Sequence, residues 1–242
     1  MVIGEKNMFK KCLFLAACLI FPLCVSAQES DLLNSETLIL DVPTANVLDK
    51  YQASLLTRAY ANGTIMESLD FGVIAQVNIG VSLAVYELVG SSDDIKVLDP
   101  DFQVKWKLFD GSLYFPAIAI GYDGRRYGYN RQTKKYLDDR KGGYITLTRE
   151  LFTPGLHLSL GANLSDFDRH DIFAFTGMSW QIKDHFAFLA EWDNINNIRD
   201  SRFNLGANIF ISPALTLTGA VRRIGRGSDN ERVLQLRYVT NF

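Results

Sequence analysis

Cysteine is absent from most of this 242-residue sequence. Its three cysteines, Cys12, Cys18 and Cys24, all fall within one short apolar run near the start. If that run is removed, the rest of the chain can form no disulfide, no thiolate metal site and no cysteine nucleophile.

The apolar run has the features of a secretory signal. Lys10 and Lys11 precede it, it extends over residues 12–25, and the small residues Ser26 and Ala27 follow. A transmembrane helix needs about 20 apolar residues, so this run is too short to span a bilayer comfortably. We therefore predict a signal peptide over residues 1–27. A lipoprotein-type signal stays open, because residues 15–18 resemble a lipid-modification box.

Charge of one sign and long apolar stretches are also scarce. The formal net charge is -2, with no basic excess to suggest nucleic acid as a partner. After residue 27 no apolar stretch is long enough to cross a membrane as a helix. The mature chain of about 215 residues is enough for one domain. A β-barrel still fits these observations, because only alternate residues of its strands face lipid.

What the chain does have is alternation of apolar and polar residues. In the final segment one face carries Leu234, Leu236, Tyr238, Thr240 and Phe242, and the other carries Val233, Gln235, Arg237, Val239 and Asn241. This period of two predicts a strand between two different environments. A terminal aromatic residue on such a strand is typical of bacterial outer-membrane barrels, so we interpret Tyr238 and Phe242 as a signal for the barrel assembly machinery.

Similar segments recur along the chain. We predict twelve strands, at 50–60, 66–77, 80–90, 101–109, 112–122, 143–151, 155–164, 171–181, 185–193, 202–211, 214–224 and 232–242. Short and long connections alternate between them. The short ones are predicted at 78–79, 110–111, 152–154, 182–184 and 212–213, and the long ones at 61–65, 91–100, 123–142, 165–170, 194–201 and 225–231. Short periplasmic turns and long outer loops are the pattern of transmembrane barrels.

The fold prediction is therefore an all-β protein: an antiparallel, up-and-down transmembrane β-barrel of about 12 strands over residues 50–242, in the cell outer membrane. The alternative is a soluble periplasmic β-domain, which would also alternate. Residues 28–49 lack the pattern and contain Pro43, so we predict an N-terminal periplasmic segment that plugs the mouth or lies along the first strand.

Alternate residues of a strand point to opposite faces of the wall, and this alternation, which we call parity, selects the side chains that should face the lumen and contact a ligand. These candidates are Arg58, Lys105, Lys107, His157, Ser159, Asn163, Glu191, Asn204, Arg222 and Arg237. Inward charges of both signs either line a water-filled path or pair across the barrel, and the sequence leaves both open.

His157 and Ser159 also admit an enzymatic interpretation. Outer-membrane lipid hydrolases use a His and a Ser two residues apart on one strand. Their sites face lipid, whereas here the opposite face carries Leu156, Leu158 and Leu160. We therefore favour polar lining of the lumen.

The 123–142 segment is the longest predicted outer loop. Its basic residues include Arg125, Arg126, Arg131, Lys134 and Lys135, interleaved with tyrosines. Such a loop could meet lipopolysaccharide phosphates or an acidic polysaccharide, or its charges could simply be solvated. No metal-ligand cluster and no phosphate-binding glycine loop are present, so no metal and no cofactor are predicted.

Several segments resemble the YjbH-like outer-membrane proteins associated with exopolysaccharide. The resemblance rests on residues 38–45 (LILDVPTA), 99–108 (DPDFQVKWKL), 115–121 (FPAIAIG) and 190–193 (AEWD), and is best over 38–122. Those proteins are much longer, so this chain would match a single barrel portion. The resemblance implies a barrel that assists export or surface handling of an exopolysaccharide, and it carries over no catalytic residue.

The functional expectation is therefore a non-enzymatic outer-membrane barrel for exopolysaccharide. The alternatives are a small general or oligosaccharide porin and an outer-membrane lipid-modifying hydrolase. The expected partners are outer-membrane lipids and lipopolysaccharide, the barrel assembly machinery and, as a further candidate, polysaccharide.

Overall fold

A computed structural model describes residues 36–61, 63–89, 95–130, 135–138, 140–166, 169–183, 185–196, 201–225 and 230–242. The predicted signal peptide, Arg131 and Lys134 lie outside these residues. For Lys135 the description covers the backbone alone. Within the described residues, no helix is long and apolar enough to cross a membrane.

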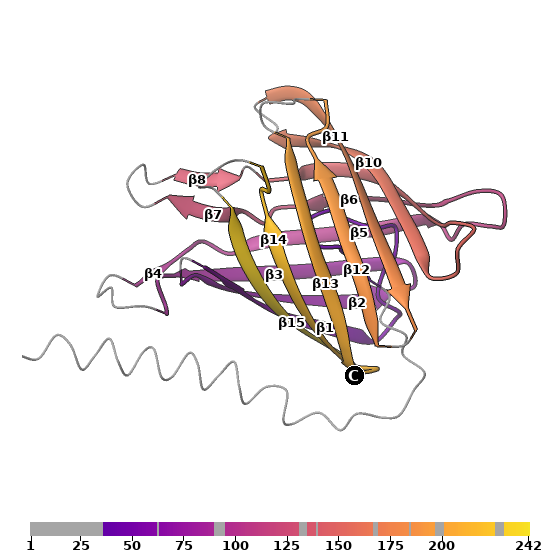
Figure 1. Cartoon of the computed structure of the whole chain (residues 1–242), viewed down its shortest axis with the longest axis horizontal. Helices are drawn as coiled ribbons and strands as arrows, with labels where there is room; N and C mark the ends of the chain where they lie inside the picture. The colour runs from indigo at the N-terminus through magenta and orange to yellow at the C-terminus, as the bar shows by residue number, and fades with distance from the viewer. Residues whose placement is uncertain are drawn as a thin grey trace, which may run out of the picture.

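The described residues form one closed ring of twelve long antiparallel strands (Figure 1). The strands are β1 (Gln52–Tyr60), β2 (Ile65–Ile74), β3 (Val77–Tyr86), β5 (Asp101–Phe109), β6 (Ala117–Asp123), β9 (Gly142–Glu150), β10 (Leu156–Asp166), β11 (Arg169–Ile182), β12 (Phe186–Asp193), β13 (Arg202–Ser212), β14 (Leu215–Arg222) and β15 (Glu231–Asn241). Each pairs with the next in this order, and β1 pairs with both β2 and β15, which closes the barrel. The predicted fold class is confirmed.

Three short strands lie within the long connections. β4 (Lys96–Val97) extends the edge of β3, while β7 (Tyr127–Asn130) and β8 (Lys135–Asp138) pair as a hairpin within the 123–142 segment. The pattern of the sequence predicts only loops in these regions.

Two predicted boundaries are wrong. The β2–β3 turn falls at residues 75–76, and Asn78 and Ile79 are already paired within β3. Gln76 takes the left-handed conformation that a tight turn requires, with φ of 70°. The strand predicted to start at residue 112 begins only at Ala117, because Pro116 has no N–H to donate to the ladder.

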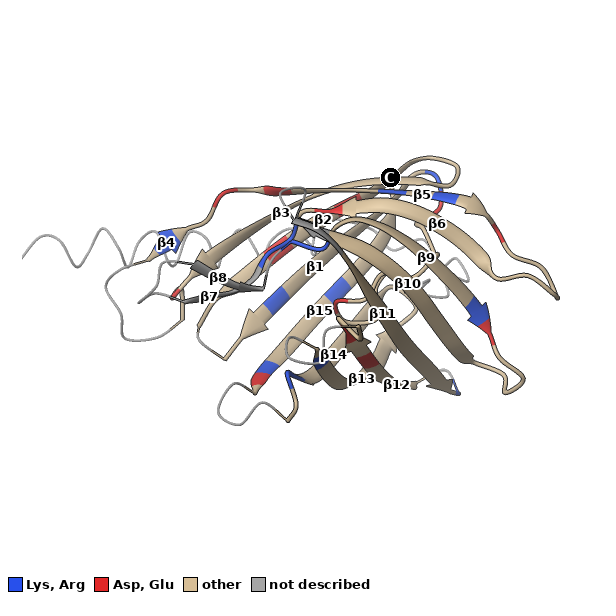
Figure 2. Cartoon of the chain, turned by 90° about the horizontal axis from the view of Figure 1, so that it is seen from above, with Lys and Arg blue, Asp and Glu red and all other residues tan. Residues whose placement is uncertain are grey.

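The two faces of the wall differ sharply in polarity. On β5 the outward Phe102, Val104 and Trp106 are exposed, whereas the inward Gln103 and Lys105 are buried. The other strands repeat this pattern, and charged positions are sparse along them (Figure 2). An apolar exterior around a polar interior is the arrangement of an outer-membrane β-barrel, and the outer membrane is where this protein resides.

Aromatic residues mark both ends of the apolar exterior. Trp106 and Trp180 lie near the short-turn ends of β5 and β11, and Trp192 lies near the long-loop end of β12, each 40–51% exposed. The terminal Phe242 meets the rings of Tyr51 and Phe71 edge-on, at centroid distances of 6.2 and 5.8 Å. We take the short-turn end as periplasmic, following the rule for such barrels.

Candidate functional site

Residues 36–49 fold into the barrel as a short hairpin, which we call the lumenal hairpin. The Ile39 N–H donates to the Val42 carbonyl at 3.0 Å, and the Thr44 N–H donates to the Thr37 carbonyl at 3.2 Å. The chain therefore reverses at Leu40 and Asp41. Both legs extend toward the short-turn end, because Asp49 leads directly into β1 there.

The tip of the lumenal hairpin carries a buried carboxylate held by two wall arginines. Arg58 of β1 donates from a terminal nitrogen to Asp41 Oδ1 at 2.8 Å, and Arg222 of β14 donates from Nε to Asp41 Oδ2 at 2.7 Å. Both arginine side chains are only 1% exposed. Charge-assisted bonds of this kind are short and strong in a dry interior.

A wall carboxylate makes the reciprocal contact with the backbone of the tip. Glu191 Oε1 accepts the N–H groups of Leu40, Asp41 and Val42 at 2.7, 2.8 and 2.7 Å. Its second oxygen accepts Asn204 Nδ2 at 3.0 Å. Three consecutive N–H groups that converge on one oxygen form an anion nest, so the tip is fixed through its backbone as well as its side chain.

The legs of the lumenal hairpin are tied to the wall by uncharged acceptors. Lys105 Nζ donates to the carbonyls of Thr37, Thr44 and Asn46 at 2.6, 3.0 and 3.1 Å. The hydroxyl of Thr148 accepts the Ala45 N–H at 2.7 Å. One lysine thus bridges both legs, and it holds them together as well as holding them in place.

The lumenal hairpin also packs through apolar contacts. Leu40, Val42, Ala45 and Leu48 are at most 1% exposed, and the first two belong to a core cluster with inward wall residues such as Phe175 and Leu189. Gly177 of the wall has no side chain, and this leaves room for the apolar residues of the hairpin. A Cβ at Gly177 would lie 2.5 Å from Ile39 Cδ1. The wall is therefore shaped to the segment that it encloses.

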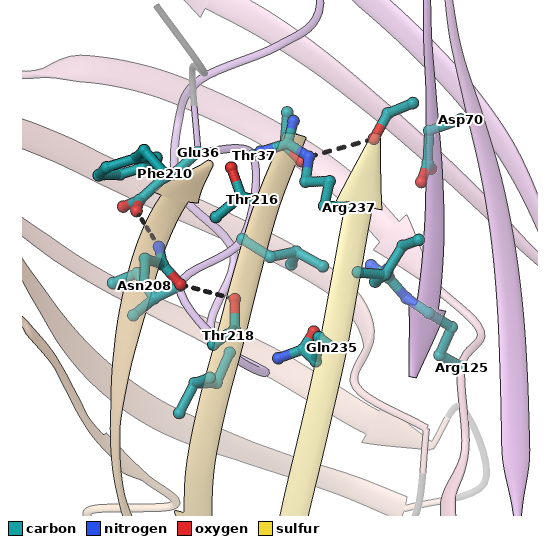
Figure 3. A pocket seen from close by; sticks show the side chains of 15 residues that line it. Glu36, Thr37, Asp70, Arg125, Asn208, Phe210, Thr216, Thr218, Gln235 and Arg237 are labelled. Carbon is teal, nitrogen blue, oxygen red and sulfur yellow. Dashed lines mark hydrogen bonds between the residues drawn. The ribbon is translucent and has the colours of Figure 1, made fainter. Parts of the chain in front are cut away.

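Small polar cavities remain beside the lumenal hairpin. The first, of about 40 Å³, lies between the first leg of the hairpin (residues 36–40) and β13 to β15, and Arg237, Gln235 and Thr218 line it (Figure 3). The second, of about 30 Å³, is lined by residues that include Asn78 and Lys105. One water needs about 10–15 Å³ of such volume, so these spaces hold a few waters at most.

Burial and pairing act in opposite directions on Asp41 and Glu36 of the lumenal hairpin. Burial opposes ionisation of Asp41, but the guanidinium groups of Arg222 and Arg58 outweigh it and hold the pKa of Asp41 well below its usual range. Glu36 is half-buried, and its partial removal from water raises its pKa, although Asn208 donates a hydrogen bond to it.

The structure brings several of the predicted lumenal residues together around the hairpin. Arg58, Lys105, Glu191, Asn204 and Arg222 contact it directly or through one partner. Of the two arrangements left open for inward charges, ion pairing is observed for Arg58 and Arg222. Glu191 instead accepts backbone N–H groups of the hairpin.

Two other predicted lumenal residues lie close to the hairpin and bond to neighbouring residues of the wall. Asn163 donates to the Lys141 carbonyl at 2.9 Å, and Arg237 donates to the Ser54 hydroxyl at 3.1 Å. Lys107 lies at the periplasmic rim and pairs with Asp110 at 2.7 Å.

His157 and Ser159 do not form the arrangement that a hydrolase would need. The hydroxyl of Ser159 lies 2.8 Å from that of Thr148, and Ser159 is 1% exposed. His157 lies nearer the rim, where it lines an open cleft of about 900 Å³ with Tyr114 and Phe152. Ser159 faces the lumen, as its parity predicts, and its hydrogen bond goes to another hydroxyl rather than to an imidazole.

Two of the predicted outer-loop residues are placed differently from expectation. Arg125 is 5% exposed, and it donates to both oxygens of Asp123 at 2.9 and 2.7 Å. Arg126 donates to Asp101 at 3.1 Å. The expectation of an exposed basic surface is wrong for Arg125, because the β6 strand carries it to the inner edge of the mouth.

Some residues of the candidate site are not selected by the sequence pattern. Asp41 lies in a segment with no periodicity, so parity could not select it. Lys141, Asp193 and Arg202 form an ion-pair cluster near the long-loop end, with distances of 3.0 and 2.7 Å to Asp193. Inward parity on β12, which selected Glu191, could also have selected Asp193. In the part of the chain that the structure describes, no group of three metal-binding side chains comes together.

Comparisons with known proteins agree with the barrel architecture. No family model and no curated protein match the chain. Among solved structures, a KdgM porin is similar with a TM-score of 0.50 and 9% identity, over 76% of this chain and 98% of that one. KdgM in complex with disordered oligogalacturonate gives a TM-score of 0.48 and 7% identity, over 79% and 99% of the two chains.

A mutant porin of Rh. blastica is more distant, with a TM-score of 0.36 and 13% identity over 75% of this chain and 56% of that one. At these identities the likeness concerns the fold alone. The fold thus defines the class, an outer-membrane β-barrel of porin-like architecture. None of these names refers to YjbH-like proteins, so that resemblance stays a prediction.

Proposed function

We propose that this protein is an outer-membrane porin for small hydrophilic solutes of the oligosaccharide class, and that the lumenal hairpin closes it in the state described here. The observation that carries the proposal is that a segment outside the barrel strands fills the lumen, and that ion pairs and hydrogen bonds hold this segment to the wall. Contacts of this kind can break and reform while the barrel itself stays closed.

The width of the barrel supports a pore. About eight strands leave an interior that side chains alone can fill, whereas barrels of sixteen strands or more leave a channel. A twelve-stranded ring lies between, and here the hairpin occupies the space that the wall side chains leave. Withdrawal of residues 36–49 would expose a lumen lined by buried polar groups such as Thr146, Thr148 and Asn204.

A sugar porin is better supported than exopolysaccharide export, which is the function that the YjbH-like resemblance implies. This proposal is supported by the similarity of the barrel to a protein named a porin, with a TM-score of 0.50. We also propose that the protein is not an enzyme, because Ser159 is buried inside the lumen and bonded to Thr148.

Planar-bilayer recording of two neighbouring lysine variants tests the proposal. Lys105→Met removes three bonds to the legs of the hairpin, whereas Lys107→Met removes a rim contact to Asp110. We expect rare openings in the wild type, frequent openings in Lys105→Met and wild-type behaviour in Lys107→Met. Liposomes that carry Lys105→Met should swell in small neutral sugars. A silent, folded Lys105→Met barrel would argue against a porin.

A further inference from the structure

The clamp around Asp41 has the composition of a carboxylate-binding site. Arg58 and Arg222 come from two strands that flank β15, and they grip the two carboxylate oxygens separately, at 2.8 and 2.7 Å. Gln235 of β15 lies between them and accepts a hydrogen bond from Arg58 at 3.0 Å. The wall supplies the donors of this site, and the hairpin supplies only the acceptor.

Both arginines of the clamp bond to the hairpin, Arg58 at two points and Arg222 at one. Arg58 donates to Asp41 and to the Leu40 carbonyl, at 2.8 and 2.7 Å, and Arg222 pairs with Asp41 as well as with Glu231 of the wall. When the hairpin withdraws, these bonds to it are lost and their N–H donors become available to another anion or to water. A guanidinium presents parallel N–H donors that match a carboxylate in shape, so a carboxylate is the preferred replacement.

We infer that Arg58 and Arg222 form a binding site for the carboxylate of an acidic sugar, and that Asp41 occupies this site as a tethered substitute. This inference rests on the proposed porin function and specifies its substrate class. An acidic sugar and the tip of the hairpin compete for the same donors, so the solute itself favours the open state.

Asp41 is tethered to the barrel, and this tether sets the concentration at which a free acidic sugar can compete with it. A short tether gives an effective concentration in the millimolar range, which a monovalent competitor must exceed. A single uronic acid should therefore act at about 10–100 mM on the wild type. An oligomer with several carboxylates should act at a lower concentration, because it engages more than one basic group of the lumen.

Asp41→Asn provides the direct test, because it removes the competing charge. The folded variant is titrated in detergent with glucuronate, with glucose, and with sodium chloride at matched ionic strength. Thermal unfolding is followed as heat-modifiable migration on a gel. We expect glucuronate to raise the unfolding midpoint of Asp41→Asn, while glucose and salt leave it unchanged. Asp49→Asn, at an exposed acid at the base of the same segment, should behave as the wild type.

Loss of the arginines should abolish the effect. Asp41→Asn combined with Arg58→Gln and Arg222→Gln removes the proposed donors, and this variant should no longer distinguish glucuronate from glucose. An equal response to glucuronate and salt, or a response that persists without the two arginines, would overturn the inference. Because the readout needs no conduction, a silent pore with a specific glucuronate shift would reject the porin function and keep the site.

A second measurement avoids any change at the clamp. Ala45→Cys places a thiol on a fully buried position of the hairpin. A membrane-impermeant maleimide should label it several-fold faster in glucuronate than in glucose. Equal labelling rates in the two sugars would contradict displacement of the hairpin, even if Asp41→Asn failed to fold.

Discussion

Removal of the Glu191 carboxylate should open the barrel more than any other single change in the wall. Glu191 accepts three backbone N–H groups of the tip and the amide of Asn204. Breaking a buried charged contact by removing one partner costs about 3–5 kcal/mol. Because about 1.4 kcal/mol changes an equilibrium tenfold, Glu191→Ala should raise the ratio of open to closed states by roughly two to four orders of magnitude.

Single-channel recording measures this ratio directly. The matched control is Glu150→Ala, which removes a carboxylate that accepts a single N–H, from Gly155, in the exposed β9–β10 turn. We expect a large gain in open probability for Glu191→Ala and none for Glu150→Ala. A folded Glu191→Ala barrel with wild-type open probability would refute the reasoning, because the tip would then not depend on its anion nest.

Three further predictions address the hairpin, its acids and the lipid face. Gly177→Leu should expel the hairpin and raise conductance, because a whole leucine side chain there would overlap both Ile39 and Val42, whereas a lone Cβ meets mainly the movable end of Ile39 at 2.5 Å. Gly219→Leu, at a position that borders open space, should conduct as the wild type. Acidification from pH 7.5 to 5 should not open the pore. Because the pKa of Asp41 is lowered, its carboxylate stabilises the closed state until the pH falls below the ordinary aspartate pKa of about 3.9. Because the pKa of Glu36 is raised, protonation of Glu36 in acid favours its half-buried position. Increased conductance at pH 5 would contradict this. Val104→Lys, on the outward face of β5, should cost about 2–4 kcal/mol of stability in denaturant titrations in lipid, and a neutral effect would contradict a lipid-facing position.

The strands could be predicted because their two faces meet different solvents. All twelve predicted segments overlap a strand of the barrel, and inward parity selected Arg58, Glu191 and Arg222 correctly. Turn positions were less predictable, because a bulge such as the one between Gly72 and Ile74 shifts the register without a clear trace in the sequence.

The site itself could not be predicted, because it depends on contacts between distant segments. Asp41 and Arg222 are 181 positions apart, and Glu191 lies about 150 positions from the N–H groups that it accepts. Residues 36–49 carry no period of two, since they contact the wall as a compact loop rather than as a strand. Only the closed ring brings these residues together.

The most direct test of the central claim is to lock the lumenal hairpin with a disulfide. A Cβ at Gly177 would lie 3.4 Å from the Cβ of Val42, close to the spacing of about 3.5–4.5 Å in a disulfide. Conductance of the Val42→Cys and Gly177→Cys double variant is measured before and after reduction. We predict a silent pore when oxidised and openings when reduced. Equal conductance in both states would contradict the claim that withdrawal of residues 36–49 opens this barrel.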